Sequence, residues 1–391
     1  MEIRKLSEAE LEQALAVWSQ AFEHGDRMMR DWKEWEEVFT GRMATYGVFD
    51  TSGLQATVLV VDYRVHFGAD RVLPMAGVCG VACLPAARGK GYASEGVRYA
   101  LAQMRANGHF LSILEPFHWG FYQNLGWDWV GVQRRYTVTT RTLQPDPETE
   151  NVRAVLPVDR GKVCAVYTQT AKRYRGMLER TPKEWDWILN DREKEYTYAY
   201  LYEKEGVPEG YLVYRGGKKE ETRLREFLAL TPRARRALLG LLRRHEMQVD
   251  KFRWTVPCDD TLWTQYYHWD IETVVRPAMM GRIVDVAAAL QHLRPEASVV
   301  GKLTLQVTDA NAPWNTGGWR IESEGGRVRV EPTDAQPGVS LDIRALAQAY
   351  FGTPSLEELR ACERISVQTE AEYRLLQVLL DGPPMWINDD F

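Results

Sequence analysis

"VACLPAARGKGYASEG", Val81 to Gly96, joins a strand-like apolar segment to a helical one through a short basic turn. The turn contains Arg88, Gly89, Lys90 and Gly91, and the helix begins directly after it. Backbone N–H groups at the start of a helix converge at the positive end of the helix dipole, so such a turn binds anions. Glycine lets the backbone approach a phosphate, and the two basic side chains supply countercharge. The stretch predicts a pyrophosphate site; the alternative is a tight turn with two solvated basic residues.

The glycine spacing of this turn argues against two common nucleotide-binding motifs. The turn lacks the GK[ST] ending of a Walker A loop, and it does not follow the GxGxxG pattern of dinucleotide-binding folds. Binding of an NTP or a dinucleotide is therefore disfavoured.

The segments on either side of the turn alternate between strand and helix. β-Branched residues and turn signals predict strands over 56–67 and 74–85. Apolar residues at helical spacing predict a helix over 94–108, and a buried strand is expected over 109–116. The order is therefore strand, Arg/Gly turn, helix, strand.

Two further units follow a polar, proline-bearing linker over 144–150. The second unit repeats the order of the first, but no glycine precedes Gly240 in its strand-to-helix turn, so we interpret it as a diverged copy without the loop chemistry. The third begins near 279–290, where Asp285 is a candidate helix N-cap, and combines hairpin-like strands with helices. The predicted strands of the second unit are 197–203, 210–216, 224–230 and 251–257, with a helix over 232–248.

Composition and charge narrow the class of protein. The 391 residues carry a net charge of −5, with 45% hydrophobic and 26% charged residues, as in ordinary globular domains. This charge gives no drive toward nucleic acid or an anionic membrane and slightly favours cationic partners. Five scattered cysteines and the absence of paired histidines predict free thiols and no metal site. No long apolar run is present, and Ser7 with Glu10 resembles a capping box rather than a signal peptide, so we expect a cytoplasmic protein.

Arg88-x-x-Gly91-x-Ala93 matches the Arg/Gln-x-x-Gly-x-Gly/Ala signature of GNAT acetyltransferases. Together with "FLSILEP", "FYQNLGW" and a terminal aromatic residue, it resembles the Eis (enhanced intracellular survival) family of these enzymes. The resemblance covers the whole chain and implies a mixed α+β fold. It implies an active GNAT domain over 1–145, a degenerate GNAT-like domain over 146–280, and a sterol-carrier-protein-like domain over 281–391.

The resemblance also implies acetyl-CoA as cosubstrate and a set of residues that bind it. The backbone of Val81, Ala82 and Cys83 would pair with the pantetheine arm as an added strand. Phe117 and His118 would lie near the thioester, although the family often has a small hydroxyl residue at the position of Phe117. The pyrophosphate would be held by the turn and the first helical residues: Arg88, Gly89, Lys90, Gly91, Tyr92, Ala93 and Ser94.

Tyr122, in "FYQNLGW", falls on the tyrosine that the family uses as general acid. A phenol has a pKa of about 10, and a thiol like that of CoA has a pKa of about 8.5. Proton transfer from the phenol to the thiolate therefore costs only roughly 2 kcal/mol, so tyrosine is a competent acid. From the residues alone, the alternative is a core tyrosine on an amphipathic helix.

A base is also needed, because a lysine-like amine with a pKa of about 10.4 is almost fully protonated at neutral pH. In the family the terminal carboxylate reaches the active site, which here implies Phe391, at the end of "WINDDF". That carboxylate titrates about seven units below the amine, so it would orient the amine or relay its proton through water. Glu115 is a second candidate. Asp389 and Asp390 would either attract a cationic substrate or form a solvated acidic tail.

The sequence therefore predicts an acetyl-CoA-dependent N-acetyltransferase that acts on a primary amine (aminoglycoside, polyamine or lysine) by direct transfer in a ternary complex. Two alternatives are a small-molecule or lipid carrier with a relic acetyltransferase domain, and a scaffold whose acidic, Trp-rich surface binds a basic protein. The stretch 31–37, "DWKEWEE", would line an amine pocket or form an ordinary amphipathic helix. The resemblance further implies a homo-oligomer, often a hexamer.

Overall fold

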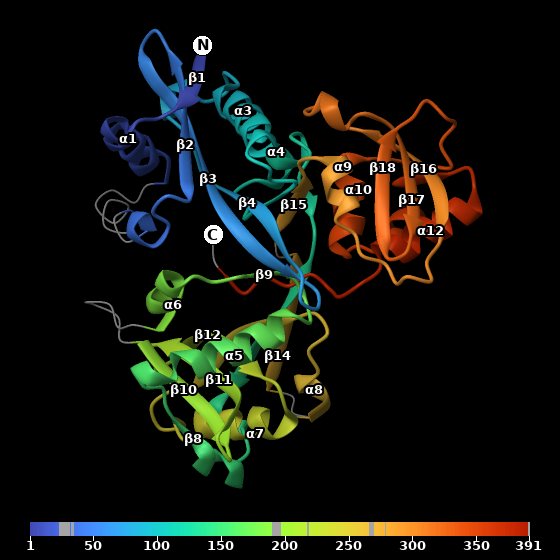
Figure 1. The fold of residues 1–391 in the computed structure, drawn as a ribbon. Helices are drawn as coiled ribbons and strands as arrows, with labels where there is room; N and C mark the ends of the chain where they lie inside the picture. Colours follow the sequence, from blue (N-terminus) through green and yellow to red (C-terminus); the bar gives the residue numbers. More distant parts are fainter. Residues whose placement is uncertain are drawn as a thin grey trace.

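The structure, a computed structural model, describes residues 1–22, 32, 35–189, 197–216, 219–265, 270–277 and 279–389. Figure 1 shows three bodies that follow the sequence: blue to teal, green to yellow, and orange to red. Each body is built around one β-sheet.

The first sheet has the order β1-β2-β3-β4-β5-β15-β6, and β9 pairs with β3. Its neighbours are antiparallel except β4 and β5, which are parallel. The strands are β1 (Glu2–Lys5), β2 (Met43–Asp50), β3 (Gly53–Phe67), β4 (Val72–Cys83), β5 (Leu111–Leu114), β6 (Asp128–Trp129), β9 (Arg175–Leu178) and β15 (Met280–Ile283), and the helices are α1 (Leu11–Phe22), α3 (Tyr92–Ala106) and α4 (Trp119–Gln123).

The two parallel strands at the centre of this sheet separate soon after they meet. Their register is Ala76 with Ser112 and Gly77 with Ile113, while β4 continues to Cys83. The β3–β4 register shifts between Thr57 and Leu59, next to Gly80. The Gly80 carbonyl there accepts hydrogen bonds from the Trp18 indole (2.9 Å) and the Thr57 hydroxyl (3.1 Å). Such an irregularity bends a strand, and here it accompanies the divergence of β4 from β5.

The second sheet has the order β14-β7-β13-β12-β11-β10-β8, with β12 and β13 parallel. As in the first sheet, a helix, α7, connects the parallel pair. It begins at Pro232 after the N-cap Thr231, without a glycine turn. The elements are β7 (Val132–Thr139), β8 (Val152–Ala154), β10 (Thr197–Lys204), β11 (Val207–Arg215), β12 (Thr222–Ala229), β13 (Lys251–Pro257), β14 (Ile271–Pro277), α5 (Arg160–Ala171), α6 (Pro182–Leu189), α7 (Pro232–Arg243) and α8 (Leu262–Gln265).

One strand of each of these sheets comes from an unexpected part of the chain. β7 precedes the polar linker but pairs with β13 and β14 of the second sheet. β15 follows the second body but lies between β5 and β6 of the first sheet. The sheets therefore divide the chain differently from the predicted boundaries at 145 and 280, which remain predictions.

The third sheet has the order β18-β17-β16-β19-β20, and Asp285 caps α9 as expected, by accepting a hydrogen bond from the Ala288 N–H. Its elements are β16 (Gly301–Thr308), β17 (Gly317–Glu324), β18 (Arg327–Pro332), β19 (Val339–Asp342), β20 (Ile365–Val367), α9 (Val286–Gln291), α10 (Ile343–Phe351), α11 (Leu356–Ala361) and α12 (Glu370–Leu380). Short 3-10 helices cover Glu8–Glu10, Pro85–Ala87, Thr140–Thr142, Pro147–Asn151, Pro157–Asp159 and Pro313–Asn315.

After α12 the chain leaves the third body and runs back between the other two, as the red segment of Figure 1 shows. Met385 forms an isolated parallel bridge with Arg175 of β9. The Arg175 guanidinium donates to the carbonyls of Tyr350 (2.6 Å) and Leu380 (3.0 Å), and the rings of Trp386 and Tyr174 lie 5.1 Å apart. The C-terminal segment is thus fixed against β9, on the route from the third body to the first.

Candidate active site

The basic turn has the conformation that the sequence predicted. Gly89 and Gly91 have φ angles of 79° and 84°, in the left-handed region that favours glycine, and α3 begins at Tyr92. A Cβ atom at either glycine would meet no other atom within 4 Å, so the space beside the turn is open. Arg88 and Lys90 are exposed. The first N–H groups of a helix have no partner within it, and here they face a turn with room for an anion.

The three residues directly after the turn are half-buried. The Tyr92 hydroxyl donates to the Asp50 carboxylate (2.8 Å), so this side chain is held by the end of β2. Asp50 also accepts a hydrogen bond from the Ser52 N–H, and these contacts, that of Ser52 first, lower the pKa of Asp50. Ala93 and Ser94 are half-buried at the start of α3.

The end of β4 leaves one edge of its backbone available. Ala82 and Cys83 pair with β3 on one side. The β4–β5 register ends at Gly77, so among the described residues no strand pairs with the other edge of the Val81–Cys83 segment. Val81 and Ala82 are buried and Cys83 is half-buried. This edge has the hydrogen-bonding pattern that an extended amide-bearing ligand could join as a further strand.

Tyr122 lies on α4 and is 3% exposed. Its ring contacts those of Phe117 and Phe121, at centroid distances of 5.4 and 5.0 Å. Burial, followed by the nearby Cys79 thiol, raises the pKa of Tyr122 above the ordinary phenol value. Within the described part of the chain no group hydrogen-bonds to the Tyr122 hydroxyl. The side chain is therefore both a packed core residue and a protonated phenol with an unused donor.

Phe117 and His118, both predicted near the thioester, have different environments. The Phe117 ring is 64% exposed although it contacts Tyr122. The His118 Nδ1 atom accepts a hydrogen bond from the Phe121 N–H (3.3 Å), so this side chain caps the N-terminus of α4. This capping role of His118 was not predicted from the sequence.

Asp389 is neither a free attractor of cations nor part of a solvated tail. Its carboxylate accepts a hydrogen bond from the Arg180 guanidinium (2.9 Å) and another from the Tyr167 hydroxyl (3.4 Å). Arg180 also pairs with Glu226. The side chains of Asp389, Arg180 and Glu226 are 9%, 1% and 0% exposed, respectively. The central domain thus holds the C-terminal segment at a buried ion cluster. Asp390 and Phe391 lie outside the described residues.

The charge of Asp389 also acts on a tyrosine of the first sheet. Burial, together with the charges of Cys79, Glu184 and Asp389, raises the pKa of Tyr63 on β3. Cys79 of β4 is in turn the charge that acts on Tyr122.

The remaining candidates contribute less to this site. The Trp32 ring lies 4.7 Å from that of Trp18, and the Trp35 ring lies 4.7 Å from that of Phe39, so both tryptophans pack against the core. The other side chains of the predicted pocket segment include Asp31, Lys33 and Glu34, which lie outside the described residues. Glu115 follows β5 and is exposed. The described residues contain no group of three or more His, Cys, Asp or Glu side chains arranged for a metal ion, and none of their helices is long and apolar enough to cross a membrane.

Comparisons with known proteins agree with this geometry. Two models described as "Acetyltransferase (GNAT) domain" match residues 2–130 and 176–283, and a "Sterol carrier protein domain" model matches 286–388. The chain is 28% identical to an uncharacterized N-acetyltransferase of Streptomyces avermitilis over 340 residues, or 82% of each chain. It is 26% identical to N-acetyltransferase Eis of Mycobacterium tuberculosis over 354 residues, or 81% of each chain.

Two solved structures extend the likeness to the whole fold. A conserved protein of unknown function from Enterococcus faecalis, described as a probable N-acyltransferase, is 26% identical with a TM-score of 0.89, and the match covers 100% of this chain and 99% of that one. Eis1 from Mycobacterium abscessus has the same fold, with a TM-score of 0.78 at 21% identity and full coverage of both chains. The predicted fold class and family are confirmed. The chain is an Eis-like GNAT N-acetyltransferase with two GNAT domains and a C-terminal sterol carrier protein domain, and its family uses an acyl-CoA cosubstrate.

Proposed function

We propose that this enzyme transfers the acetyl group of acetyl-CoA directly to a primary amine in a ternary complex. The observation that carries this proposal is that one packed cluster joins α3, β4 and Tyr122. The cluster contains Val97 and Leu101 of α3, Val78 and Val81 of β4, and Tyr122 of α4. This packing supports the proposal, because it holds Tyr122 against the end of β4 and against the helix that directly follows the basic turn.

Acetyl-CoA fits these groups in its chemistry. The backbone from Gly89 to Ser94 would bind the pyrophosphate, with Arg88 and Lys90 as countercharges. The edge of Val81, Ala82 and Cys83 would pair with the amides of the pantetheine arm. Phe117, exposed beside Tyr122, would cover the thioester end, and His118 would act by capping α4.

Tyr122 would protonate the thiolate that leaves when the amine attacks. Its raised pKa keeps the phenol protonated at neutral pH but makes it a weaker acid, at about 1.4 kcal/mol for each pKa unit. Burial raises the pKa of any acid whose charged form it desolvates, and the departing thiolate would leave in the same buried region. Burial would therefore raise the pKa of the phenol and that of the CoA thiol in the same direction. Because the free energy of the proton transfer depends on the difference between these two pKa values, the transfer stays close to balanced.

The Phe391 carboxylate is the proposed base. Asp389, the last described residue, is fixed by Arg180, and the proposed base follows it by two residues in the chain. A carboxylate there would orient the ammonium group and relay its proton. Glu115 is the second candidate. Aminoglycosides, polyamines and lysine side chains all carry the required amine.

The carrier alternative has less support. The hollow of about 600 Å³ in the third domain lies over β16, β19, β20 and the end of α11, and its lining mixes polar or charged side chains with apolar ones: Gln306, Thr308, Ser340, Leu341, Arg360, Glu363, Arg364, Ile365, Ser366 and Val367. Arg360, Glu363 and Arg364 place charges in this mixed lining, which suits an acyl chain less well than the mainly apolar walls typical of small-molecule and lipid sites.

Replacement of Tyr122 by Phe tests the proposal. The change removes the proton donor and little else, so kcat should fall about 10²–10⁴-fold while acetyl-CoA affinity, measured by calorimetry, stays within about twofold. A folded Tyr122→Phe enzyme with native kcat, in a reaction shown to be limited by chemistry, would show that Tyr122 is not the acid.

A further inference from the structure

The helix that carries Tyr122 is too short to hold its own position. α4 has five residues, and isolated helices of that length are unstable in water. His118 caps its N-terminus. Its last carbonyls, those of Tyr122 and Gln123, accept hydrogen bonds from N–H groups of the segment that follows, so the position of α4 depends on how that segment is held.

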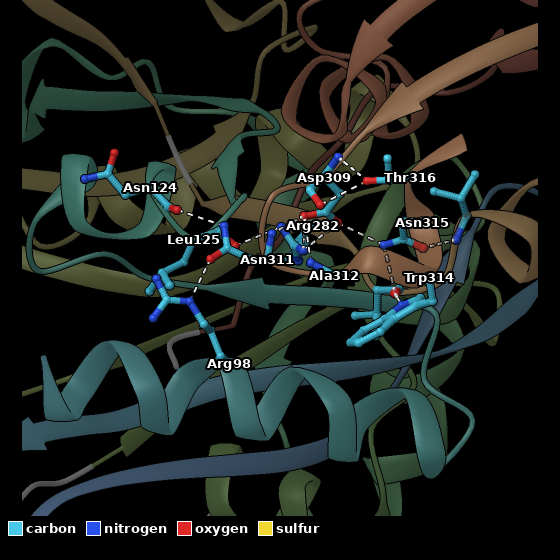
Figure 2. A network of polar contacts seen from close by, with 12 residues as sticks. Arg98, Asn124, Leu125, Arg282, Asp309, Asn311, Ala312, Trp314, Asn315 and Thr316 are labelled. Carbon is cyan, nitrogen blue, oxygen red and sulfur yellow. Dashed lines mark hydrogen bonds and ion pairs between the residues drawn. The ribbon is translucent and has the colours of Figure 1, made fainter. Parts of the chain in front are cut away.

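The carbonyls of Asn124 and Leu125, directly after α4, find donors in β15 and in the third domain, as Figure 2 shows. The Arg282 guanidinium donates to the Leu125 carbonyl (2.8 Å), and the Asn311 side-chain amide donates to the Asn124 carbonyl (2.9 Å). The backbone N–H groups of Leu125 and Trp127 both donate to the Tyr122 carbonyl, at 3.0 and 3.1 Å. The donors therefore hold the segment that follows Tyr122 directly.

Arg282 is itself fixed by Asp309 of the third domain. Both side chains are fully buried, and the guanidinium donates to both carboxylate oxygens (2.9 and 2.7 Å). The carboxylate also accepts hydrogen bonds from the Asn311 and Ala312 N–H groups and from the Asn315 amide. Each charge is thus compensated, as a buried ion pair requires.

The glycine of "FYQNLGW" has its explanation in this contact. Gly126 has a φ of 91°, and a Cβ atom there would lie 1.4 Å from an Arg282 Nη atom. Only glycine lets the guanidinium lie against the backbone after α4.

Asn311 also connects the segment after α4 to α3, the helix that follows the basic turn. Its amide oxygen accepts a hydrogen bond from Arg98 of α3 (2.9 Å), while its amide nitrogen donates to the Asn124 carbonyl. Arg105 of α3 pairs with Asp285 (2.7 Å), which caps the first helix of the third domain. One side of the third domain thus contacts both helices that the proposed reaction needs.

We propose that Arg282, Asp309 and Asn311 are positioning residues that set Tyr122 relative to the acyl-CoA bound at α3. This inference rests on the proposed role of Tyr122. It assigns the third domain a part in the chemistry of the first, besides the delivery of the C-terminal segment. A displacement of about 1 Å at a reacting group can cost up to about 10²-fold in rate. Loss of the contacts made by Arg282, Asp309 and Asn311 should therefore reduce kcat without removing any group that contacts substrate.

The test uses the full chain with Asn311→Ala, Arg282→Met and the double variant Arg282→Met/Asp309→Leu. We expect kcat to fall about tenfold for Asn311→Ala and up to about 10²-fold for the variants that lack Arg282, with acetyl-CoA affinity within about twofold of native. Lys302→Met is the matched control, because Lys302 forms an exposed pair with Glu322 on the same domain (3.0 Å), and its kcat should stay native.

Each change is repeated in the Tyr122→Phe background. A purely structural role of the three residues would cause the same loss of kcat there as in the native background. If the three residues act by positioning the Tyr122 hydroxyl, that hydroxyl is absent in this background. The additional loss of kcat should therefore be less than about twofold. Equal losses in both backgrounds, or native kcat in Asn311→Ala with its amide contacts gone, would overturn the inference. If an Arg282 variant does not fold, Asn311→Ala carries the test, because its side chain is only half-buried. Native kcat in Tyr122→Phe alone would instead overturn the proposed acid, and with it the inference.

Discussion

Gly91 combines a special backbone conformation with an open position beside α3. Its φ of 84° is one that β-branched residues adopt only with strain, and strain of this kind costs about 1–3 kcal/mol. We expect Gly91→Val to move the N–H groups of the turn and to weaken acetyl-CoA binding by at least tenfold, with a smaller effect on the KM for the amine. Calorimetric titration of the folded variant measures this, and unchanged affinity would remove the turn from the cofactor site.

Tyr122 also determines a pH dependence. Because burial raises its pKa above the ordinary value of about 10, the phenol keeps its proton as the pH rises through the range in which amines begin to deprotonate. The ratio of kcat for the native enzyme to kcat for Tyr122→Phe should therefore stay constant from about pH 7 to about pH 9.5. A ratio that falls with an apparent pKa below about 9 would contradict this environment for Tyr122.

At the scale of elements, the C-terminal segment depends on a buried cation. Loss of Arg180 would leave Glu226 and Asp389 buried without their partner, and unpaired buried charges cost about 3–5 kcal/mol. We expect Arg180→Met to release the segment, so that carboxypeptidase removes the last residues at least tenfold faster, and kcat falls. Arg160→Met, which breaks an exposed pair with Asp186 in the same domain, is the control. Unchanged digestion of Arg180→Met would show that other contacts hold the segment.

The proposed base makes the position of the terminal carboxylate important. One appended residue converts that carboxylate to an amide and moves the charge by up to about 3.6 Å. We expect such an extension, or deletion of Phe391, to abolish most acetyl transfer while acetyl-CoA binding persists, and Phe391→Leu to retain activity. Native turnover of the extended enzyme would assign the base to Glu115 or to a water chain.

The elements also show what local sequence can reveal. The strand, turn and helix around Gly91 were predictable because they lie in one contiguous motif, and the proposed role of Tyr122 likewise comes from a contiguous motif. Arg282 and Arg180 were not, because their carboxylate partners lie 27 and 209 residues away in the chain. Asp389 looked like one of several charges in an acidic tail, since nothing in the sequence distinguishes a buried acid from a solvated one. The short apolar strand β15 likewise carries no signal of which sheet it joins.

At the scale of the molecule, the three domains were predictable in kind, because each has its own alternation of strands and helices. The exchange of β7 and β15 between the first two sheets was not, because it depends on pairing across distant segments. Together with the Asp309 contacts, this exchange makes the first domain dependent on residues beyond 279. We expect residues 1–145 expressed alone to aggregate or to fold poorly, whereas a cooperative native-like unfolding transition of that fragment would contradict this dependence.

Assembly is a further proposal at this scale. The family resemblance suggests a homo-oligomer, such as a hexamer, and fourteen tryptophans offer large side chains for interfaces. Light scattering at micromolar concentration should give several times the mass of one chain. The mass of a single 45.0 kDa chain would contradict it.

Direct acetyl transfer to an amine is the central claim, and initial-rate kinetics test it most directly. Thiol release from acetyl-CoA is measured with a panel of aminoglycosides, polyamines and lysine peptides, and both substrates are then varied for the best amine. We predict amine-dependent release, an N-acetylated product by mass spectrometry, and intersecting double-reciprocal lines, as a ternary complex requires. Acetyl-CoA binding without amine-dependent release for any amine, or parallel lines with an acetylated enzyme, would contradict the claim.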